Sequence, residues 1–94
     1  MGKDEILSLI SRGRTDLVVA LLDLPDAADC IKEGPVSALQ WFVYYGDATA
    51  LRMVQRQGLD LSGLDLGREL GNAAFFGHWK VADLLISLGA DPNW

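Results

Sequence analysis

Cysteine and histidine each occur only once in this chain, as Cys30 and His78. A single cysteine cannot form a disulfide within the chain, so we expect a free, partly buried thiol in a cytoplasmic protein, because the cytoplasm keeps thiols reduced. One histidine and one cysteine fall short of the four ligands of a structural zinc site. A cysteine nucleophile also needs a histidine base beside it, and no spacing brings His78 to Cys30. The sequence therefore predicts no metal and no cofactor.

Long apolar runs and basic residues are scarce as well. Hydrophobic residues make up 50% of the chain, yet no run approaches the roughly 20 residues that cross a bilayer. Eight Lys and Arg residues stand against 13 Asp and Glu, which gives a net charge of −5, and the basic residues are scattered. A nucleic-acid surface needs clustered positive charge to neutralise phosphates. We therefore expect neither a membrane nor a nucleic acid as a partner.

The motifs of common catalytic sites are also missing. No glycine-rich phosphate loop follows a candidate strand, and no Gly-x-Ser-x-Gly turn occurs. The carboxylates are spread over expected helix surfaces and loops rather than paired for acid–base chemistry. These absences predict that the protein is not an enzyme.

What the sequence does contain is an apolar pattern that occurs three times and ends each time at a glycine. The apolar residues are spaced i, i+3 and i+4 and glycine follows at i+7, which is one face of a helix with glycine at its end. The copies are Ile6, Leu9, Ile10 and Gly13; Leu39, Phe42, Val43 and Gly46; and Leu70, Ala73, Ala74 and Gly77. The glycines are 33 and 31 residues apart. A second apolar stripe follows each glycine, so we expect three helix pairs, with Ala73 and Ala74 buried.

The helix ends can be predicted from the same pattern. The expected pairs are 4–11 with 15–24, 37–45 with 48–57, and 69–76 with 79–88, and no extended sheet is expected. Asp4 and Ser37 are placed to cap the first helix of the first two pairs. Arg68 occupies the corresponding position of the third pair. Gly46 and Gly77 are expected in the left-handed conformation.

Two segments between the pairs are expected to be loops. The segment 25–35 begins and ends with proline, which stops helical continuation. The segment 58–67 reads as a short finger with Leu59 and Leu61 packed onto the helices. A calcium loop is a poorer interpretation of it, because only Asp60 and Asp65 supply carboxylates.

The stretch from Asn72 to Asn93 identifies a family. It contains, in order, Ala73-Ala74, Gly77-His78, Leu84-Leu85-Ile86 and Gly89-Ala90-Asp91-Pro92-Asn93. In this it resembles one ankyrin repeat, a helix–turn–helix–finger unit that recurs about every 33 residues. The resemblance implies an all-α, ankyrin-like solenoid, a single domain over 1–94 with units of about 1–34, 35–65 and 66–94 joined by finger loops. Because the last finger only begins, either the third unit is the last or the array is longer.

The resemblance also implies a protein-binding module, in which residues just before each turn glycine line a concave groove. The residues at these positions are Tyr44, Tyr45, Phe75 and Phe76, with Trp41 and Trp79 as further candidates. Neighbouring helical residues point about 100° apart, so both members of a doublet cannot face the core. Either the rings contact a partner, or one ring of each doublet is core. In the second case we expect binding on the fingers, at Lys32, Glu33, Leu64 and Asp65.

Two alternatives to binding an unrelated partner in the groove remain. One is a self-associating structural subunit, a homo-oligomer held together by its apolar C-terminal unit, which carries Phe75, Phe76, Trp79 and Trp94. The other is an acidic inhibitor or immunity-type protein that covers a basic site on its partner, which the net charge of −5 would favour.

Overall fold

The computed structural model describes residues 2–90, and within this range the chain is entirely helical and turn-forming, without strands. Its elements in chain order are α1 (Lys3–Ser11), the short 3₁₀ helix η1 (Thr15–Leu17), α2 (Val18–Leu22), α3 (Ala27–Cys30), α4 (Ala38–Tyr44), α5 (Ala48–Gln57), α6 (Leu66–Phe76) and α7 (Trp79–Ser87). The six predicted helices are all present, with boundaries that differ by at most three residues. None of the described helices is long and apolar enough to span a bilayer.

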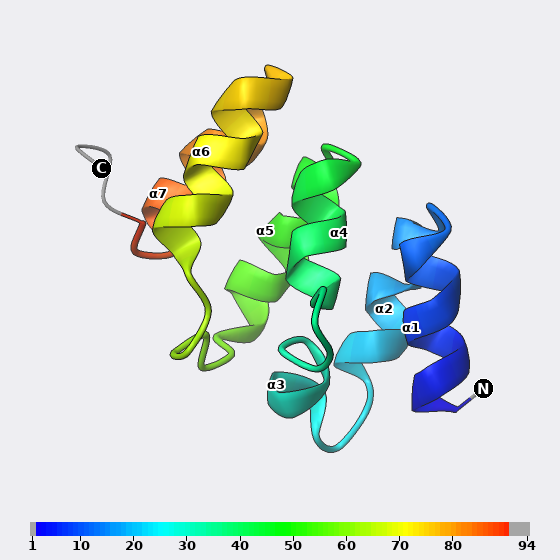
Figure 1. The fold of residues 1–94 in the computed structure, drawn as a ribbon. Coiled ribbons are helices and arrows are strands. Elements are labelled where there is room, and N and C mark those ends of the chain that lie inside the picture. Colours follow the sequence, from blue (N-terminus) through cyan, green and yellow to red (C-terminus); the bar gives the residue numbers. More distant parts are fainter. Residues whose placement is uncertain (1, 91–94) are drawn as a thin grey trace.

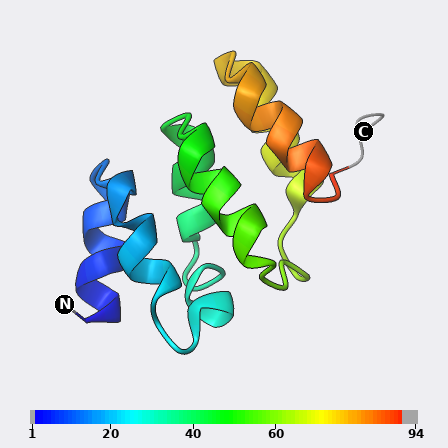
Figure 2. The same ribbon diagram turned by 180° about the vertical axis from the view of Figure 1, so that it is seen from behind.

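The helices form two rows (Figures 1 and 2). One row consists of α1, α4 and α6, and the other of α2, α5 and α7, with each helix packed on its neighbour in the row. The helices α4 and α5 form one antiparallel pair and α6 and α7 another, while α1 packs on η1 and α2. The described residues therefore form three helix pairs side by side.

The core lies between these rows and is built from the predicted stripes. Leu39, Phe42 and Val43 of α4 are each at most 1% exposed, and they join Ile6 and Ile10 of α1 in one continuous apolar cluster. The helical period places residues i, i+3 and i+4 on one face, so this single face of α4 packs against both neighbouring pairs. Burial of these side chains is what couples each pair to the next.

The turns inside the pairs are made by glycine, as predicted. Gly46 has a φ of 69° and Gly77 a φ of 76°, both in the left-handed region that residues with a β-carbon avoid. The amide of Gly77 donates to the carbonyl of Ala74, and the amide of His78 donates to that of Ala73. These bonds satisfy carbonyls that the end of α6 would otherwise leave without a donor.

Of the two predicted helix caps, Ser37 is confirmed and Asp4 is wrong. Ser37 does cap α4, accepting from the Gln40 amide while the Gln40 side chain accepts from the Ser37 amide. However, α1 follows Gly2 without a side-chain cap, so Asp4 lies within its first turn. The third pair begins three residues earlier than expected, because the carboxylate of Asp65 accepts from the amide of Arg68 at 3.0 Å. A carboxylate can accept such a bond and a guanidinium cannot.

Two further expectations need correction. The segment 25–35 is not purely loop, because residues 27–30 form the short helix α3 and bury Cys30 and Ile31. Ala73 is fully buried as predicted, but Ala74 is exposed. Val43, which occupies the same position in the second pair, is buried. The helix α4 packs between α1 and α6, whereas α6 is the last described helix of its row.

Candidate functional site

The aromatic doublets lie at the ends of α4 and α6, and all four rings are exposed. The exposed fractions are 53% for Tyr44, 40% for Tyr45, 86% for Phe75 and 44% for Phe76. The alternative in which one ring of each doublet belongs to the core is therefore wrong. The core at these helix ends is made by Phe42, Val43 and Ala73 instead.

The rings form one connected surface across the second and third pairs. Tyr44 meets Phe76 edge to face, with ring centroids 5.6 Å apart, and this contact bridges α4 and α6. Trp41, one turn earlier on α4, stacks on Tyr45 at 5.9 Å and meets Tyr44 edge to face at 5.8 Å. These distances fall in the 4.5–7 Å range in which aromatic rings attract one another. The rings are thus held in place before any partner binds.

A groove runs between α4 and α6 beside this surface, and we call it the α4–α6 groove. Its volume is about 430 Å³, within the ~300–1,000 Å³ range of ligand sites. It is lined by Val36, Gln40, Trp41, Val43 and Tyr44 on one side and by Glu69, Asn72 and Phe76 on the other. The lining residues of α6 recur at intervals of three and four, which places them on one face of that helix. The groove is aromatic toward the ends of the helices and polar toward their beginnings.

Phe75 and Trp79 lie outside the α4–α6 groove. Phe75 packs edge to face on Phe76, with ring centroids 5.6 Å apart, and otherwise faces solvent. Trp79 is the first residue of α7 and is 66% exposed. Of the six aromatic residues predicted from the sequence, the structure brings Trp41, Tyr44 and Phe76 into one groove.

Two side chains connect the helix pairs at equivalent points. The Tyr45 hydroxyl donates to the carbonyl of Ser11 at 2.8 Å, and His78 Nε2 lies 3.3 Å from the carbonyl oxygen of Tyr44. Ser11 and Tyr44 each stand two residues before a turn glycine. Although His78 directly precedes α7, its side chain makes no cap bond to that helix. Tyr45 and His78 therefore each hold one pair against the preceding pair.

The polar finger residues mainly shape the loops that carry them. Asp65 caps α6, and Glu33 pairs with Lys3 at 3.1 Å. Asp60 accepts from the Ser62 amide at 2.9 Å, and this bond, helped by the Ser62 hydroxyl and by the charge of Lys32, lowers the pKa of Asp60. Their contacts are accounted for by loop and helix structure.

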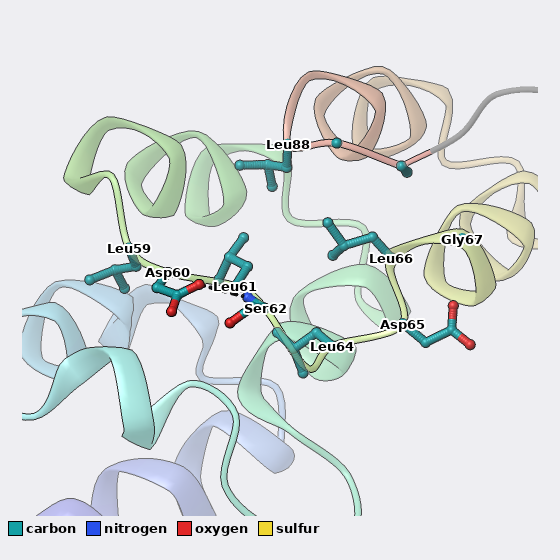
Figure 3. Close-up of a pocket in the computed structure, with 11 residues that line it drawn as sticks. Leu59, Asp60, Leu61, Ser62, Leu64, Asp65, Leu66, Gly67 and Leu88 are labelled. Atoms are coloured by element: carbon teal, nitrogen blue, oxygen red, sulfur yellow. Dashed lines mark hydrogen bonds between the residues drawn. The ribbon is translucent and has the colours of Figure 1, made fainter.

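A second cavity, of about 530 Å³, lies at the loop between α5 and α6 (Figure 3). Leucine side chains of this loop and Leu88 at the end of α7 surround it. Leu59 and Leu61 pack against the core as predicted, and so does Leu64. Leu64 and Asp65 thus line a cavity. Its charged side chains among the described residues are Asp60 and Asp65, and both already accept backbone hydrogen bonds.

Cys30 is buried and chemically quiet. Burial, together with a hydrogen bond to the Asp26 side chain, raises the pKa of the Cys30 thiol to about 11. A reactive cysteine needs the opposite shift, because the thiolate is the nucleophile. Within residues 2–90 no group of three or more His, Cys, Asp or Glu side chains could hold a metal ion.

Five residues that line the α4–α6 groove were not among the predicted site residues: Val36, Gln40, Val43, Asn72 and the buried Glu69. With α6 starting at Leu66, Glu69 falls in its first turn and faces α4, on the same side as Asn72 and Phe76. The side chain is a carboxylate, yet the residue is only 3% exposed. Glu69 stands four residues before Ala73, which the stripe predicts to be buried, and this spacing was the signal available in the sequence.

None of the protein-family models, curated proteins or solved structures compared with this chain matches it.

Proposed function

We propose that this chain is a non-enzymatic protein-binding module of the ankyrin-repeat type, and that it binds a partner protein through the α4–α6 groove. Support for the repeat assignment comes from the glycines 33 and 31 residues apart and from three helix pairs packed in two rows. The equivalent bridges from Tyr45 to Ser11 and from His78 to Tyr44 add to it. We place the protein in the cytoplasm, where a single buried thiol stays reduced.

The observation that carries the binding proposal is the exposed contact between Tyr44 and Phe76. Large aromatic side chains at the centre of an interface supply much of its binding energy, because they bury a large area and have few rotatable bonds. Here the two rings come from different helix pairs, meet above a groove, and are about half exposed in the free protein. A partner that covers them gains the burial energy without reordering the rings first.

A selection experiment tests the proposal. The full chain is immobilised and used to select ligands from a library of displayed random peptides, and the affinity of each selected ligand is measured by calorimetry. We expect Tyr44→Ala and Phe76→Ala each to weaken binding at least ~30-fold, since true anchors lose ~2 kcal/mol or more. Val19→Ala is the control, because Val19 is exposed on α2, in the other row. Unchanged affinity in both aromatic variants would exclude the α4–α6 groove as the binding site.

A second candidate function is self-association through the open side of the third helix pair. This pair carries Phe75, Trp79 and Ile86 as exposed side chains together with Ala74, which makes its surface unusually apolar. Sedimentation equilibrium at increasing concentrations decides this point. A dimer that dissociates on Trp79→Ser supports self-association, and a monomer at all concentrations excludes it.

A further inference from the structure

Glu69 is a buried carboxylate that lacks full hydrogen bonding to the described residues. The residue is 3% exposed, and its Oε1 atom has no hydrogen-bond partner in the part of the chain that the structure describes. The nearest cationic atom is Nε of Arg68, at 3.5 Å, whereas charge-assisted hydrogen bonds are about 2.7–2.9 Å long. Removing a charge from water without such bonds is unfavourable.

The position of Glu69 in the first turn of α6 accounts for a negative charge but not for its burial. The positive end of the helix dipole favours a carboxylate there. An exposed carboxylate would benefit in the same way, as the cap Asp65 does. The side chain is directed instead toward α4, where it lines the α4–α6 groove.

Among residues 2–90, Glu69 is the one charged side chain that lines the α4–α6 groove. Gln40 and Asn72, its polar neighbours in the lining, are neutral, and the Gln40 carbonyl is already used by the amide of Ser37 at 2.8 Å. The other end of the groove carries Trp41 and Tyr44. A side chain that fits both ends must be apolar along its length and positively charged at its tip.

We propose that the α4–α6 groove accepts a basic side chain of the partner protein, with arginine preferred. Its methylene groups would lie against the Tyr44 and Phe76 rings while the guanidinium bonds to Glu69. Arginine suits this arrangement better than lysine because its planar group stacks on aromatic rings such as Trp41 and binds a carboxylate at the same time. The net charge of −5 favours a basic partner segment. This inference rests on the proposed function and adds the chemistry of the ligand.

In the free protein the cation beside Glu69 is Arg68, and the contact between them is weak. Its side chain is 58% exposed and approaches Glu69 from the preceding residue of the same helix. A neighbour on the helix cannot point along the groove as a ligand from outside can. The partner's arginine therefore replaces a weak contact with Arg68 rather than competing with a saturated one.

The test uses peptides selected on the full chain as described above. We expect the groove-dependent peptides to share a basic residue, and replacing it with citrulline, its uncharged isostere, to weaken binding to the wild-type protein at least ~10-fold. Glu69→Gln should weaken the arginine peptide by a similar factor and leave the citrulline peptide almost unchanged. Glu5→Gln, which makes the same charge change at an exposed position of α1, is the control.

The outcomes separate this inference from the proposed function. If Tyr44→Ala weakens binding but neither Glu69→Gln nor citrulline does, the groove binds proteins without a basic anchor, and the inference is wrong. If no selected peptide responds to Tyr44→Ala either, both proposals fail. Should Glu69→Gln not fold, the citrulline comparison on the wild-type protein still decides, because it leaves the protein unchanged.

Discussion

The imidazole of His78 lies directly against the α-carbon of Gly46. A β-carbon at residue 46 would be only 2.8 Å from two atoms of this ring, closer than packed side chains approach. The same ring also contacts the carbonyl oxygen of Tyr44. His78, the first residue after the turn of the third pair, therefore packs against the turn of the second pair. Glycine at position 46 thus serves both the left-handed turn and the contact between pairs.

The first prediction follows from this contact. Gly46→Ala and Gly77→Ala both introduce a β-carbon at positive φ, which costs about 1 kcal/mol or more. Only Gly46→Ala also displaces the His78 ring, since nothing lies near a β-carbon on Gly77. We expect Gly46→Ala to reduce the free energy of unfolding by about 1 kcal/mol more than Gly77→Ala, as measured by urea denaturation.

A double variant provides the control. In a His78→Ala background the obstruction is gone, so Gly46→Ala and Gly77→Ala should lose similar stability. An equal loss for the two glycine variants already in the wild-type background would show that the His78 ring moves away without cost.

The second prediction concerns the hydroxyl of Tyr45. Its hydrogen bond to Ser11 joins the first two helix pairs, whereas the Tyr44 hydroxyl has no such bond among the described residues. Tyr45→Phe should therefore lower the free energy of unfolding by roughly 0.5–1 kcal/mol, at the lower end of typical values because the ring is partly exposed. Tyr44→Phe is the matched control and should change stability very little. Identical denaturation curves for the two variants would mean that the bond contributes nothing.

The third prediction uses the two alanines of α6. Ala73 is fully buried and Ala74 is exposed, although they are adjacent and chemically identical. Ala73→Leu should overpack the core and lower the free energy of unfolding by about 1–3 kcal/mol, while Ala74→Leu should be nearly neutral. Thermal melts of the two variants test the register of α6 directly. A larger loss for Ala74→Leu would contradict it.

The fourth prediction concerns the stability of the protein in alkaline solution. The folded-state pKa of Cys30 is raised to about 11, against roughly 8.5 in the unfolded chain. The stability that comes from keeping the thiol neutral is therefore complete below pH ~8.5 and is lost as the pH rises through about 11. On the order of 2–3 kcal/mol should disappear over this interval.

Urea denaturation between pH 8 and 11 measures this loss, with Cys30→Ala as the reference, since it lacks the thiol. The difference in unfolding free energy between the two proteins should narrow as the pH rises. A constant difference would show that the thiol titrates normally.

The helix pairs could be predicted from the sequence because each depends on local signals. The spacing of Leu39, Phe42 and Val43 fixes one face of α4 whatever surrounds it, and glycine at the end of a helix marks a turn. The exposure of Ala74 could not be predicted in the same way. It depends on whether another helix pair covers that side of α6, and the residue type is the same in either case.

The burial of Glu69, the charged residue of the candidate site, could not be predicted from the sequence. Glu69 precedes Ala73 by four residues, so the two residues share a face of α6. Whether a carboxylate on that face is buried depends on how closely α4 packs against α6, which the spacing does not give. The bridges made by Tyr45 and His78 were hidden for another reason. Tyr45 stands just before its turn glycine, whereas His78 stands just after its own. An alignment of the repeats therefore does not pair the two residues, although both contact equivalent carbonyls.

The last prediction separates binding from folding on α4. Tyr44 and Phe42 are both aromatic residues of this helix, but Tyr44 is about half exposed and Phe42 is fully buried. Tyr44→Ala should weaken the ligands selected on the groove by at least ~2 kcal/mol and shift the melting temperature only slightly. Phe42→Ala should cost about 3–5 kcal/mol of stability, enough to unfold much of a small domain of this kind.

Tyr44 is a better choice for this comparison than Tyr45, whose hydroxyl also supports the fold. Calorimetric titration and thermal melts on the same preparations give both quantities. If Tyr44→Ala melts as early as Phe42→Ala, its ring is part of the core in solution, and the groove loses its principal anchor.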